Sequence, residues 1–294
     1  MRWDIDGRHV PHREWSRFVT AGGLKFHVQV TGPEGAPVLL LIHGTGATTH
    51  SFADLAPLLA QQFRVVIPDL PGHGFTGKLN SPDPDTVAKA LAALMAALNV
   101  APAIILGHSV GAAVAFMLAA RGLLQPQAIV ALGGALLPFA GVGKAYPGIA
   151  KALFVNPFMP AIFSFTTRLQ SMPDLLGRWT GSRSSREQVA HYERLFRSPA
   201  HTAGALSLMA HWDLDTIERS IAQITCPVLL LHGERDKTVP PATSHTVARR
   251  LASHGVSVVH RGLPGLGHLA HEEAPGAHAE LIIDFAREVG VLPG

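Results

Sequence analysis

Short apolar runs alternate with longer helical patterns along most of this chain of 294 residues. Several runs, such as residues 37–43 and 227–232, are apolar almost throughout, which is typical of strands covered on both faces. Strands that alternate with helices form a mostly parallel sheet with helices on either side. The alternation therefore predicts an α/β fold built on a doubly wound sheet.

The individual elements can be placed from apolar runs, turn residues and caps. The expected strands are residues 17–20, 24–31, 37–43, 63–69, 103–107, 128–132, 227–232 and 256–260. The expected helices are residues 51–62, 84–99, 110–121, 244–253 and 274–289. Ser51 is a residue type that favours the N-cap, and we expect it to cap the first of these helices.

The alternation stops between residues 136 and 215, where the pattern becomes helical, irregular and interrupted by proline. We therefore expect residues 1–135 and 216–294 to form one core domain, with residues 136–215 inserted as a helical lid. Ligands of doubly wound sheets bind outside the carboxyl ends of the strands, and we expect the lid to cover that edge.

Composition narrows the class of protein. Apolar residues make up 47% of the chain and charged residues 15%, which is typical of a globular protein. The formal charge of +3 is too small for this length to indicate a nucleic-acid-binding surface. One cysteine, Cys226, cannot form an internal disulfide, and the acidic start Met1 to Asp6 lacks the apolar stretch of a signal peptide. We expect a cytoplasmic protein.

The motif Gly107-His108-Ser109-Val110-Gly111 lies between an expected strand and an expected helix. A tight turn in this context exposes a serine hydroxyl at the tip of the strand, and small flanking residues let the helix approach closely. The new helix also directs its first N–H groups at any anion that forms beside the serine. We therefore predict that Ser109 is a nucleophile.

A serine hydroxyl becomes a good nucleophile only when a neighbouring imidazole accepts its proton. The chain has 17 histidines, so position must select among them. His268 lies in a glycine-rich loop after the last expected strand, from which it can reach back to Ser109, and we predict it as the base. His271 is the alternative.

The acid of such a site follows a strand and precedes the base, since a carboxylate on the far nitrogen fixes the tautomer of the imidazole. Asp236 follows the expected strand 227–232, and we predict it as the acid; Glu234 is the alternative. The resulting order of serine, aspartate and histidine is the one expected for a hydrolase of this architecture.

The turn His43-Gly44-Thr45-Gly46 follows the expected strand 37–43. Its glycines allow an N–H group to point into the cleft, where it could stabilise a developing oxyanion. We predict the N–H groups of Thr45 and Val110 as the two donors. We expect His43 to brace this loop through hydrogen bonds.

Taken together, residues 43–46, 69–74, 107–111, 233–236 and 267–268 resemble the landmarks of the α/β-hydrolase superfamily, in order and across essentially the whole chain. The resemblance implies an α/β-hydrolase fold and a serine hydrolase that cleaves an ester or related acyl bond. Serine at position 109 distinguishes the chain from the branches that use aspartate there.

A narrower resemblance involves residues 1–4, 69–76, 134–139 and 156–158. These stretches look like the magnesium-chelatase accessory family of bacteriochlorophyll biosynthesis. That resemblance implies a role near magnesium insertion into a tetrapyrrole, with magnesium-chelatase subunits as partners.

The expected lid carries eight Lys or Arg against five Asp or Glu, an excess equal to the charge of the whole chain. It is also rich in large apolar side chains that suit a bulky ligand or a membrane-facing surface. The predicted substrate-binding residues are Phe139, Phe154, Phe158, Met159 and Phe163. With the resemblance, this composition favours a tetrapyrrole or another amphipathic small molecule whose carboxylates pair with the basic residues.

The sequence shows no phosphate-binding loop, no dinucleotide fingerprint and no spacing typical of a metal site, and triad chemistry needs no cofactor. Two functions follow. The first is a serine hydrolase that uses Ser109, His268 and Asp236. The second is a non-catalytic accessory protein that binds a tetrapyrrole or a chelatase subunit on a hydrolase scaffold.

Overall fold

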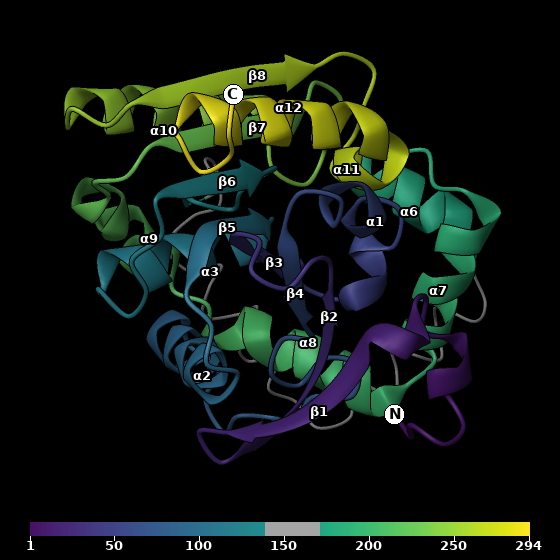
Figure 1. Cartoon of the computed structure of the whole chain (residues 1–294). Coiled ribbons are helices and arrows are strands. Elements are labelled where there is room, and N and C mark those ends of the chain that lie inside the picture. Colours follow the sequence, from purple (N-terminus) through teal and green to yellow (C-terminus); the bar gives the residue numbers. More distant parts are fainter. Residues whose placement is uncertain (139–170) are drawn as a thin grey trace.

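The computed structural model describes residues 1–138 and 171–294. Within them the core is an eight-stranded sheet with the order β1-β2-β4-β3-β5-β6-β7-β8 (Figure 1). The strands are β1 Ser16–Ala21, β2 Leu24–Thr31, β3 Val38–Ile42, β4 Arg64–Pro68, β5 Pro102–His108, β6 Ala128–Leu132, β7 Val228–Gly233 and β8 Val258–Leu263. From β4 to β8 all neighbours are parallel, whereas β2 pairs antiparallel with both β1 and β4.

The mostly parallel sheet predicted from the sequence is thus confirmed, with each expected strand within a few residues of its place. The apolar runs form its centre because side chains on one strand alternate between two cores. In β3, Leu40 and Ile42 lie in the core on one face, and Leu39 and Leu41 in the core on the other.

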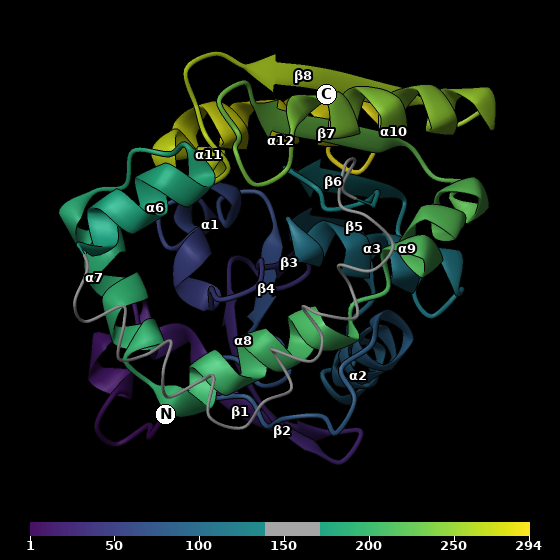
Figure 2. The same ribbon diagram turned by 180° about the vertical axis from the view of Figure 1, so that it is seen from behind.

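Helices cover both faces of the sheet. The first core packs against α2 Pro84–Ala97, α3 Val110–Ala120, α9 Leu214–Ser220 and α10 Pro241–Ser253. The second packs against α1 Ala56–Leu59 and α12 Pro275–Glu288. Figures 1 and 2 show α10 and α12 on opposite sides of β7 and β8. Short elements complete this part of the chain: η1 Gly7–His9, η2 Arg13–Trp15, η3 Thr49–Phe52, η4 Ile221–Gln223 and α11 Ala270–Glu273.

The predicted helix over residues 51–62 is wrong. The chain there forms η3 and then the separate short helix α1, which has a proline in its first turn. Ser51 does not cap a helix, because its hydroxyl lies 2.5 Å from Glu272 Oε1 and 3.0 Å from His271 Nε2. A long-range buried contact has therefore replaced the local cap that the sequence favours.

Three further helices belong to the expected lid: α6 Met172–Thr180, α7 Arg186–Phe196 and α8 Pro199–His211. A small apolar cluster joins α6 and α7 to the core through Ala47 and Leu269. Gly204 of α8 lies against Gly72, and an added Cβ would stand only 1.9 Å from the Gly72 carbonyl oxygen. The helix α9, by contrast, packs into the core through Ile217, so the described part of the lid region ends before it.

The N-terminal segment folds back onto the sheet. Trp3 packs edge-to-face on Phe75 at 5.0 Å and on Phe18 at 5.1 Å between ring centroids. Two of the stretches that carry the narrower resemblance, residues 1–4 and 69–76, therefore lie in contact.

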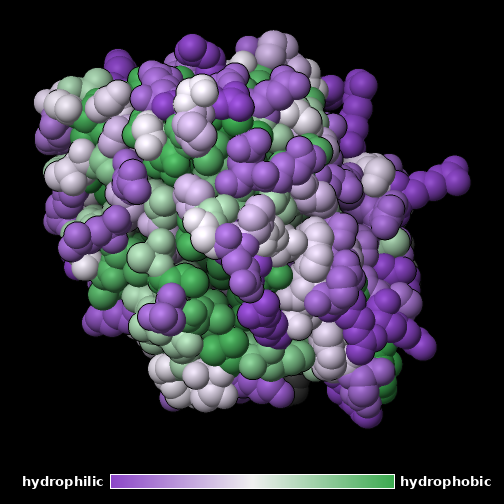
Figure 3. All heavy atoms as spheres, viewed as in Figure 1, coloured by the Kyte–Doolittle hydropathy of each residue, from purple (hydrophilic) through white to green (hydrophobic). Residues whose placement is uncertain are grey.

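The face of the molecule seen in Figure 1 carries mostly polar residues, with apolar ones gathered toward its lower left (Figure 3). Among the described residues, no helix combines the length and the apolar character that crossing a membrane requires.

Candidate active site

Ser109 lies at the sharp turn between β5 and α3, near the point where the strand order reverses. Its backbone has φ 53° and ψ −117°, a conformation that a residue with a side chain rarely adopts. Three backbone hydrogen bonds hold it: Ser109 N–H donates to Leu132 O, and Ser109 O accepts from Ala112 and Ala135. Strain retained by so many contacts is typical of a functional residue.

The two glycines of the motif are required by close approach. A Cβ on Gly107 would lie 2.2 Å from the carbonyl carbon of Gly111, and one on Gly111 would lie 2.1 Å from Ile42 O. Any side chain at either position would push α3 away from the sheet and move Ser109.

His268 and Asp236 form a buried pair. The His268 Nδ1 and Asp236 Oδ2 atoms lie 2.7 Å apart, and the side chains are 6% and 0% exposed. The other carboxylate oxygen, Oδ1, accepts hydrogen bonds from the N–H groups of Thr238 and Val239, both at 2.8 Å. The carboxylate is thereby oriented, and it fixes the imidazole with its proton on Nδ1 and its lone pair on Nε2.

Ser109 and His268 line one cavity. The His268 main chain is held by its own carbonyl, which lies 3.0 Å from His108 Nε2, and by its N–H, which donates to Thr180 O. Within the described residues the Ser109 hydroxyl makes no hydrogen bond to His268. Catalytic hydrogen bonds are often long before substrate binds, and they tighten in the complex.

Thr45 and Val110 line the same cavity as Ser109. In the part of the chain that the structure describes, neither backbone N–H donates a hydrogen bond, and Val110 is the first residue of α3. Unpaired donors at a helix N-terminus and in a tight turn are the arrangement that an oxyanion hole needs.

The two alternative residues, Glu234 for the acid and His271 for the base, do not lie where the proposed chemistry needs them. Glu234 is exposed and makes no contact with His268 in the described structure. His271 is buried against Phe52, with Nε2 at 3.0 Å from Ser51 Oγ, and it does not line the cavity. Burial lowers the pKa of His271 well below its ordinary value, which leaves its ring neutral.

His43 braces the loop after β3, as expected. Its Nδ1 donates to Gly44 O at 2.8 Å, and its Nε2 accepts from the Leu70 N–H at 2.9 Å. Burial lowers the pKa of His43, so the neutral ring can both donate and accept. The ring therefore ties the loop after β3 to the loop after β4.

The loop after β4 is anchored by Asp69. Its carboxylate accepts from the N–H groups of Thr49 and Phe75 and lies 2.8 Å from His27 Nδ1. Burial alone would raise the pKa of Asp69, but His27 and these donors hold it below its ordinary value. The carboxylate of Asp69 therefore stays ionised, and it serves to hold the loop in place.

The cavity at Ser109 has a volume of about 480 Å³, within the range of small-molecule sites. Its lining comes from the loops after β3, β5, β6, β7 and β8, from α6, α7 and α8, and from the start of α9. No Lys, Arg, Asp or Glu of the described residues lines it. Unpaired charges are costly in such surroundings, so these walls suit a neutral, apolar ligand.

Aromatic and aliphatic side chains of the three lid helices form the outer wall. Trp179 and Met209 are 46% and 49% exposed, two of the three large hydrophobic residues so exposed in the described structure. The described apolar lining residues outside the core loops are Leu176, Trp179, Tyr192, Phe196, Ala205, Leu206, Met209, Trp212 and Leu214. None of these residues was predicted from the sequence, although their helical spacing in an apolar lid was a usable signal.

The residues predicted to bind substrate, Phe139, Phe154, Phe158, Met159 and Phe163, lie outside the described residues. The five described cations of the expected lid, Arg178, Arg183, Arg186, Arg194 and Arg197, do not line the cavity, and their pairing with a ligand stays a prediction.

A buried polar cluster connects the lid to the core behind the cavity. Tyr192 of α7 donates its hydroxyl to Glu272 Oε1 at 2.7 Å, and Ser51 donates to the same oxygen at 2.5 Å. The Gln188 side chain donates to Glu272 O. Burial raises the pKa of Glu272 to about 7 and raises the pKa of Tyr192 well above its usual range.

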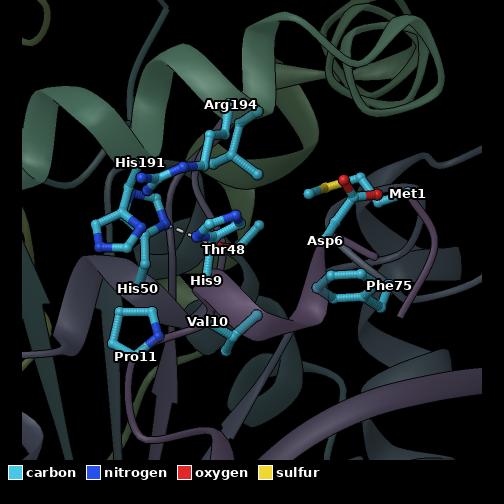
Figure 4. A pocket seen from close by; sticks show the side chains of 11 residues that line it. Met1, Asp6, His9, Val10, Pro11, Thr48, His50, Phe75, His191 and Arg194 are labelled. Carbon is cyan, nitrogen blue, oxygen red and sulfur yellow. Dashed lines mark hydrogen bonds between the residues drawn. The ribbon is translucent and has the colours of Figure 1, made fainter. Parts of the chain in front are cut away.

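A second, smaller pocket lies between the N-terminal segment and α7 (Figure 4). It is lined by His9, His50, His191 and Arg194, and Thr48 is hydrogen-bonded to His50 Nδ1. Burial lowers the pKa of His50 well below its ordinary value, and the charge of the nearby His191 lowers it further. The volume of this pocket, about 40 Å³, has room for water molecules only and is too small for an ester substrate.

Histidines also meet away from the cavity. His232, His245 and His260 place one ring nitrogen each within 4.8 Å of the others, a group that could hold a metal ion. The sequence gives no sign of it, because the three residues come from separate elements with no ligand spacing along the chain.

Comparisons with known proteins agree with this architecture. A family model of the alpha/beta hydrolase fold matches residues 37–275. The chain is 36% identical to the magnesium-chelatase 30 kDa subunit of Rhodobacter capsulatus, over 94% of this chain and 95% of that protein. It is 28% identical to a bifunctional esterase/perhydrolase of Acinetobacter calcoaceticus, over 83% and 91% of the respective chains. The crystal structure of Cfl2 from Burkholderia cenocepacia matches with a TM-score of 0.73 at 25% identity, covering 92% of this chain and 95% of that one.

Proposed function

Because the chain belongs to the α/β-hydrolase fold family, we propose that it is a serine hydrolase that cleaves an ester or related acyl bond. The observation that carries the proposal is a single cavity lined by Ser109, His268, Thr45 and Val110, with Asp236 bonded to His268 behind it. A nucleophile, a base and two anion-binding N–H groups around one space meet the requirements of acyl transfer.

In this mechanism the Ser109 oxygen attacks the carbonyl carbon of the substrate while His268 Nε2 takes its proton. Asp236 keeps the Nδ1 proton in place and stabilises the imidazolium that forms. The carbonyl oxygen becomes negatively charged and accepts hydrogen bonds from the Thr45 and Val110 N–H groups. Losing one such donor typically costs about 3 to 4 kcal/mol.

Collapse of the tetrahedral intermediate breaks the bond to the leaving alcohol, which receives the proton from His268. The acyl group then remains on Ser109 as an ester. A water molecule next gives a proton to His268 and attacks the acyl carbon. The bond from the acyl carbon to the Ser109 oxygen then breaks, that oxygen takes the proton back from His268, and the carboxylic acid leaves.

The walls of the cavity indicate the substrate class. With no charged residue on the described lining, the groups next to the scissile bond are neutral and apolar. A volume of about 480 Å³ accepts a bulky acyl or alcohol group. If a tetrapyrrole binds here, its carboxylates find no cation on the described wall, so its ester or ring portion occupies the cavity.

The relative from Rhodobacter capsulatus, called a magnesium-chelatase subunit, supports a place for this chain in tetrapyrrole biosynthesis. We infer that the hydrolase acts at or near magnesium insertion and works with chelatase subunits.

Turnover of nitrophenyl esters of increasing acyl length tests the proposal. Wild-type protein should hydrolyse them with a preference for apolar chains, and Ser109→Ala should lose activity by roughly 10⁶-fold, to the limit of detection. Ser253→Ala, an exposed serine on α10, serves as the matched control and should keep wild-type activity. Wild-type protein that hydrolyses no ester, or a Ser109→Ala variant that keeps its rate, would contradict the hydrolase assignment.

The similarity to a chelatase subunit over 94% of the chain also favours a second candidate, a non-catalytic tetrapyrrole-binding protein. Titration of protoporphyrin with the protein, followed by absorbance and read together with the ester assay, separates the two, because the second function requires a shift without ester turnover. Under this second function the spectrum shifts with saturation and Ser109→Ala leaves the shift unchanged. An unshifted spectrum would remove this candidate.

A further inference from the structure

Three histidines meet on the side of the sheet that α10 covers. His232 is near the end of β7, His260 is in β8, and His245 is in α10. The His260 Nε2 and His232 Nδ1 atoms lie 3.2 Å apart, and a nitrogen of His245 completes a group within 4.8 Å. The ring centroids of His245 and His260 are 4.5 Å apart, so the three imidazole rings lie close together.

The fold itself brings these side chains together. Strands β7 and β8 are parallel neighbours, with Leu230 opposite His260 and His232 opposite Gly262. Side chains two residues apart on a strand share a face, so His232 points to the same side as Leu230, which belongs to the core under α10. Figure 2 shows α10 running alongside β7 and β8 on this side.

One spacing among the three ring nitrogens fits a coordination sphere as it stands. Two imidazole nitrogens at about 2.0 to 2.1 Å from a tetrahedral Zn²⁺ lie about 3.3 Å from each other. The observed 3.2 Å between His232 and His260 is close to this value. His245 is exposed, so a change of its side-chain rotamer can bring its nitrogen into place.

We propose that His232, His245 and His260 form a binding site for a divalent transition-metal ion of the Zn²⁺ class, with water in the fourth position. Neutral imidazole suits Zn²⁺, Ni²⁺ and Cu²⁺, whereas Mg²⁺ requires oxygen ligands. No carboxylate of the described residues belongs to the group. The ligands of this site therefore differ in type from the oxygen ligands that a Mg²⁺ site would need.

The surroundings suit such an ion. Exposed His245 and half-buried His260 provide an entry path from solvent. The Nε2 atom of His232 and the Oε1 atom of Glu234 lie beside Gly262, at 3.2 and 3.3 Å from where its Cβ would be. Glu234 is therefore the nearby carboxylate that could take the outer-shell position which carboxylates often occupy around zinc-bound histidines.

Occupancy has a structural consequence for the candidate active site. An ion held by β7, β8 and α10 fastens the helix to the edge of the sheet. Asp236 follows His232 by four residues on the loop that leaves β7, and the same ion would restrict that loop. The ion would stabilise the fold without contacting the cavity, because only His268 and His108 among the histidines line it.

Calorimetric titration of the untagged full chain with ZnCl₂, after treatment with a chelator, tests the site. The wild type should bind one Zn²⁺ per chain with saturation, and thermal unfolding should shift upward when Zn²⁺ is present. His245→Ala and His260→Ala should each weaken binding by at least about tenfold and abolish the shift. MgCl₂ should produce neither effect.

His254→Ala is the matched control, an exposed histidine just beyond the end of α10, and it should bind like the wild type. Because His245 is exposed, its variant keeps the fold, which circular dichroism verifies. Wild-type protein without a saturable Zn²⁺ isotherm, or binding equally strong in His245→Ala, would overturn the proposal. Ester turnover is measured separately, so failure of this site leaves the hydrolase proposal standing.

Discussion

Replacing Asp236 with Asn changes one atom of the proposed acid while keeping its shape. The Asn oxygen remains the acceptor for the N–H groups of Thr238 and Val239, which donate to Asp236 Oδ1 at 2.8 Å. The new amide N–H₂ group then faces His268 Nδ1, which lies 2.7 Å from the present Oδ2. An imidazole that accepts at Nδ1 must carry its proton on Nε2, so it cannot take the proton of Ser109.

The expected loss follows from this tautomer. An amide at the corresponding position of a serine protease lowers kcat about 10⁴-fold. At about 1.36 kcal/mol per tenfold, the loss corresponds to roughly 5.4 kcal/mol of activation free energy. KM should change little, because Asp236 does not line the cavity. Steady-state hydrolysis of a nitrophenyl ester gives both constants.

Glu234→Gln is the matched control, since this exposed carboxylate is on the same loop and should keep wild-type kcat. Thermal unfolding of Asp236→Asn should show a single folded state, because its hydrogen-bond acceptor is retained. An Asp236→Asn variant with kcat within about tenfold of the wild type would refute the reasoning about the tautomer.

Three further outcomes are expected. Burial raises the pKa of Glu272 from 4.5 to about 7, so the folded chain keeps a proton that the unfolded chain loses. The contribution of Glu272 to stability should therefore fall between about pH 4.5 and pH 7, by a total on the order of 3 kcal/mol, while buried neutral histidines such as His50 and His271 add stability as the pH rises. Glu272→Gln should remove this slope in thermal unfolding, and parallel pH curves for the two proteins would contradict the assignment. Leu206→Trp fills part of the cavity and should raise KM about tenfold for long-chain esters but not for acetates, whereas equal effects would place the acyl chain elsewhere. Tyr192→Phe removes a donor to Glu272 and should lower the free energy of unfolding by about 1 to 3 kcal/mol in denaturant titrations, and an unchanged midpoint would count against that hydrogen bond.

The sheet could be predicted from the sequence because parallel strands carry a strong local signal. Runs such as Val228–Gly233 are apolar on both faces, and the turn residues that bound them are visible along the chain. The motif around Ser109 is local in part, because Gly107 is required by its contact with Gly111, whereas Gly111 is required by its contact with the distant residue Ile42.

Long-range contacts were not predictable in the same way. Ser51 looks like a helix cap, yet its partners Glu272 and His271 lie more than 200 residues away. The three-histidine group has the same character, because β7, β8 and α10 each supply one ring. A sequence records the residue types at such sites, but only the folded sheet shows which of them meet.

The proposed base and acid could be predicted in part. Chain order and position after a strand selected His268 and Asp236, and the structure brings these two side chains to 2.7 Å. Nothing in the sequence indicated that Thr180, in the lid, would accept a hydrogen bond from the His268 N–H. Through this contact, a segment whose pattern predicted only irregular helices helps to position His268, the proposed base.

Reaction of the wild-type protein with a fluorophosphonate, followed by mass spectrometry of its peptides, tests the central claim most directly. The account predicts one adduct, on the peptide that contains Ser109, with none in Ser109→Ala and a much slower reaction in His268→Ala. A wild-type Ser109 that stays unlabelled while an added serine hydrolase in the same tube is fully modified would contradict it.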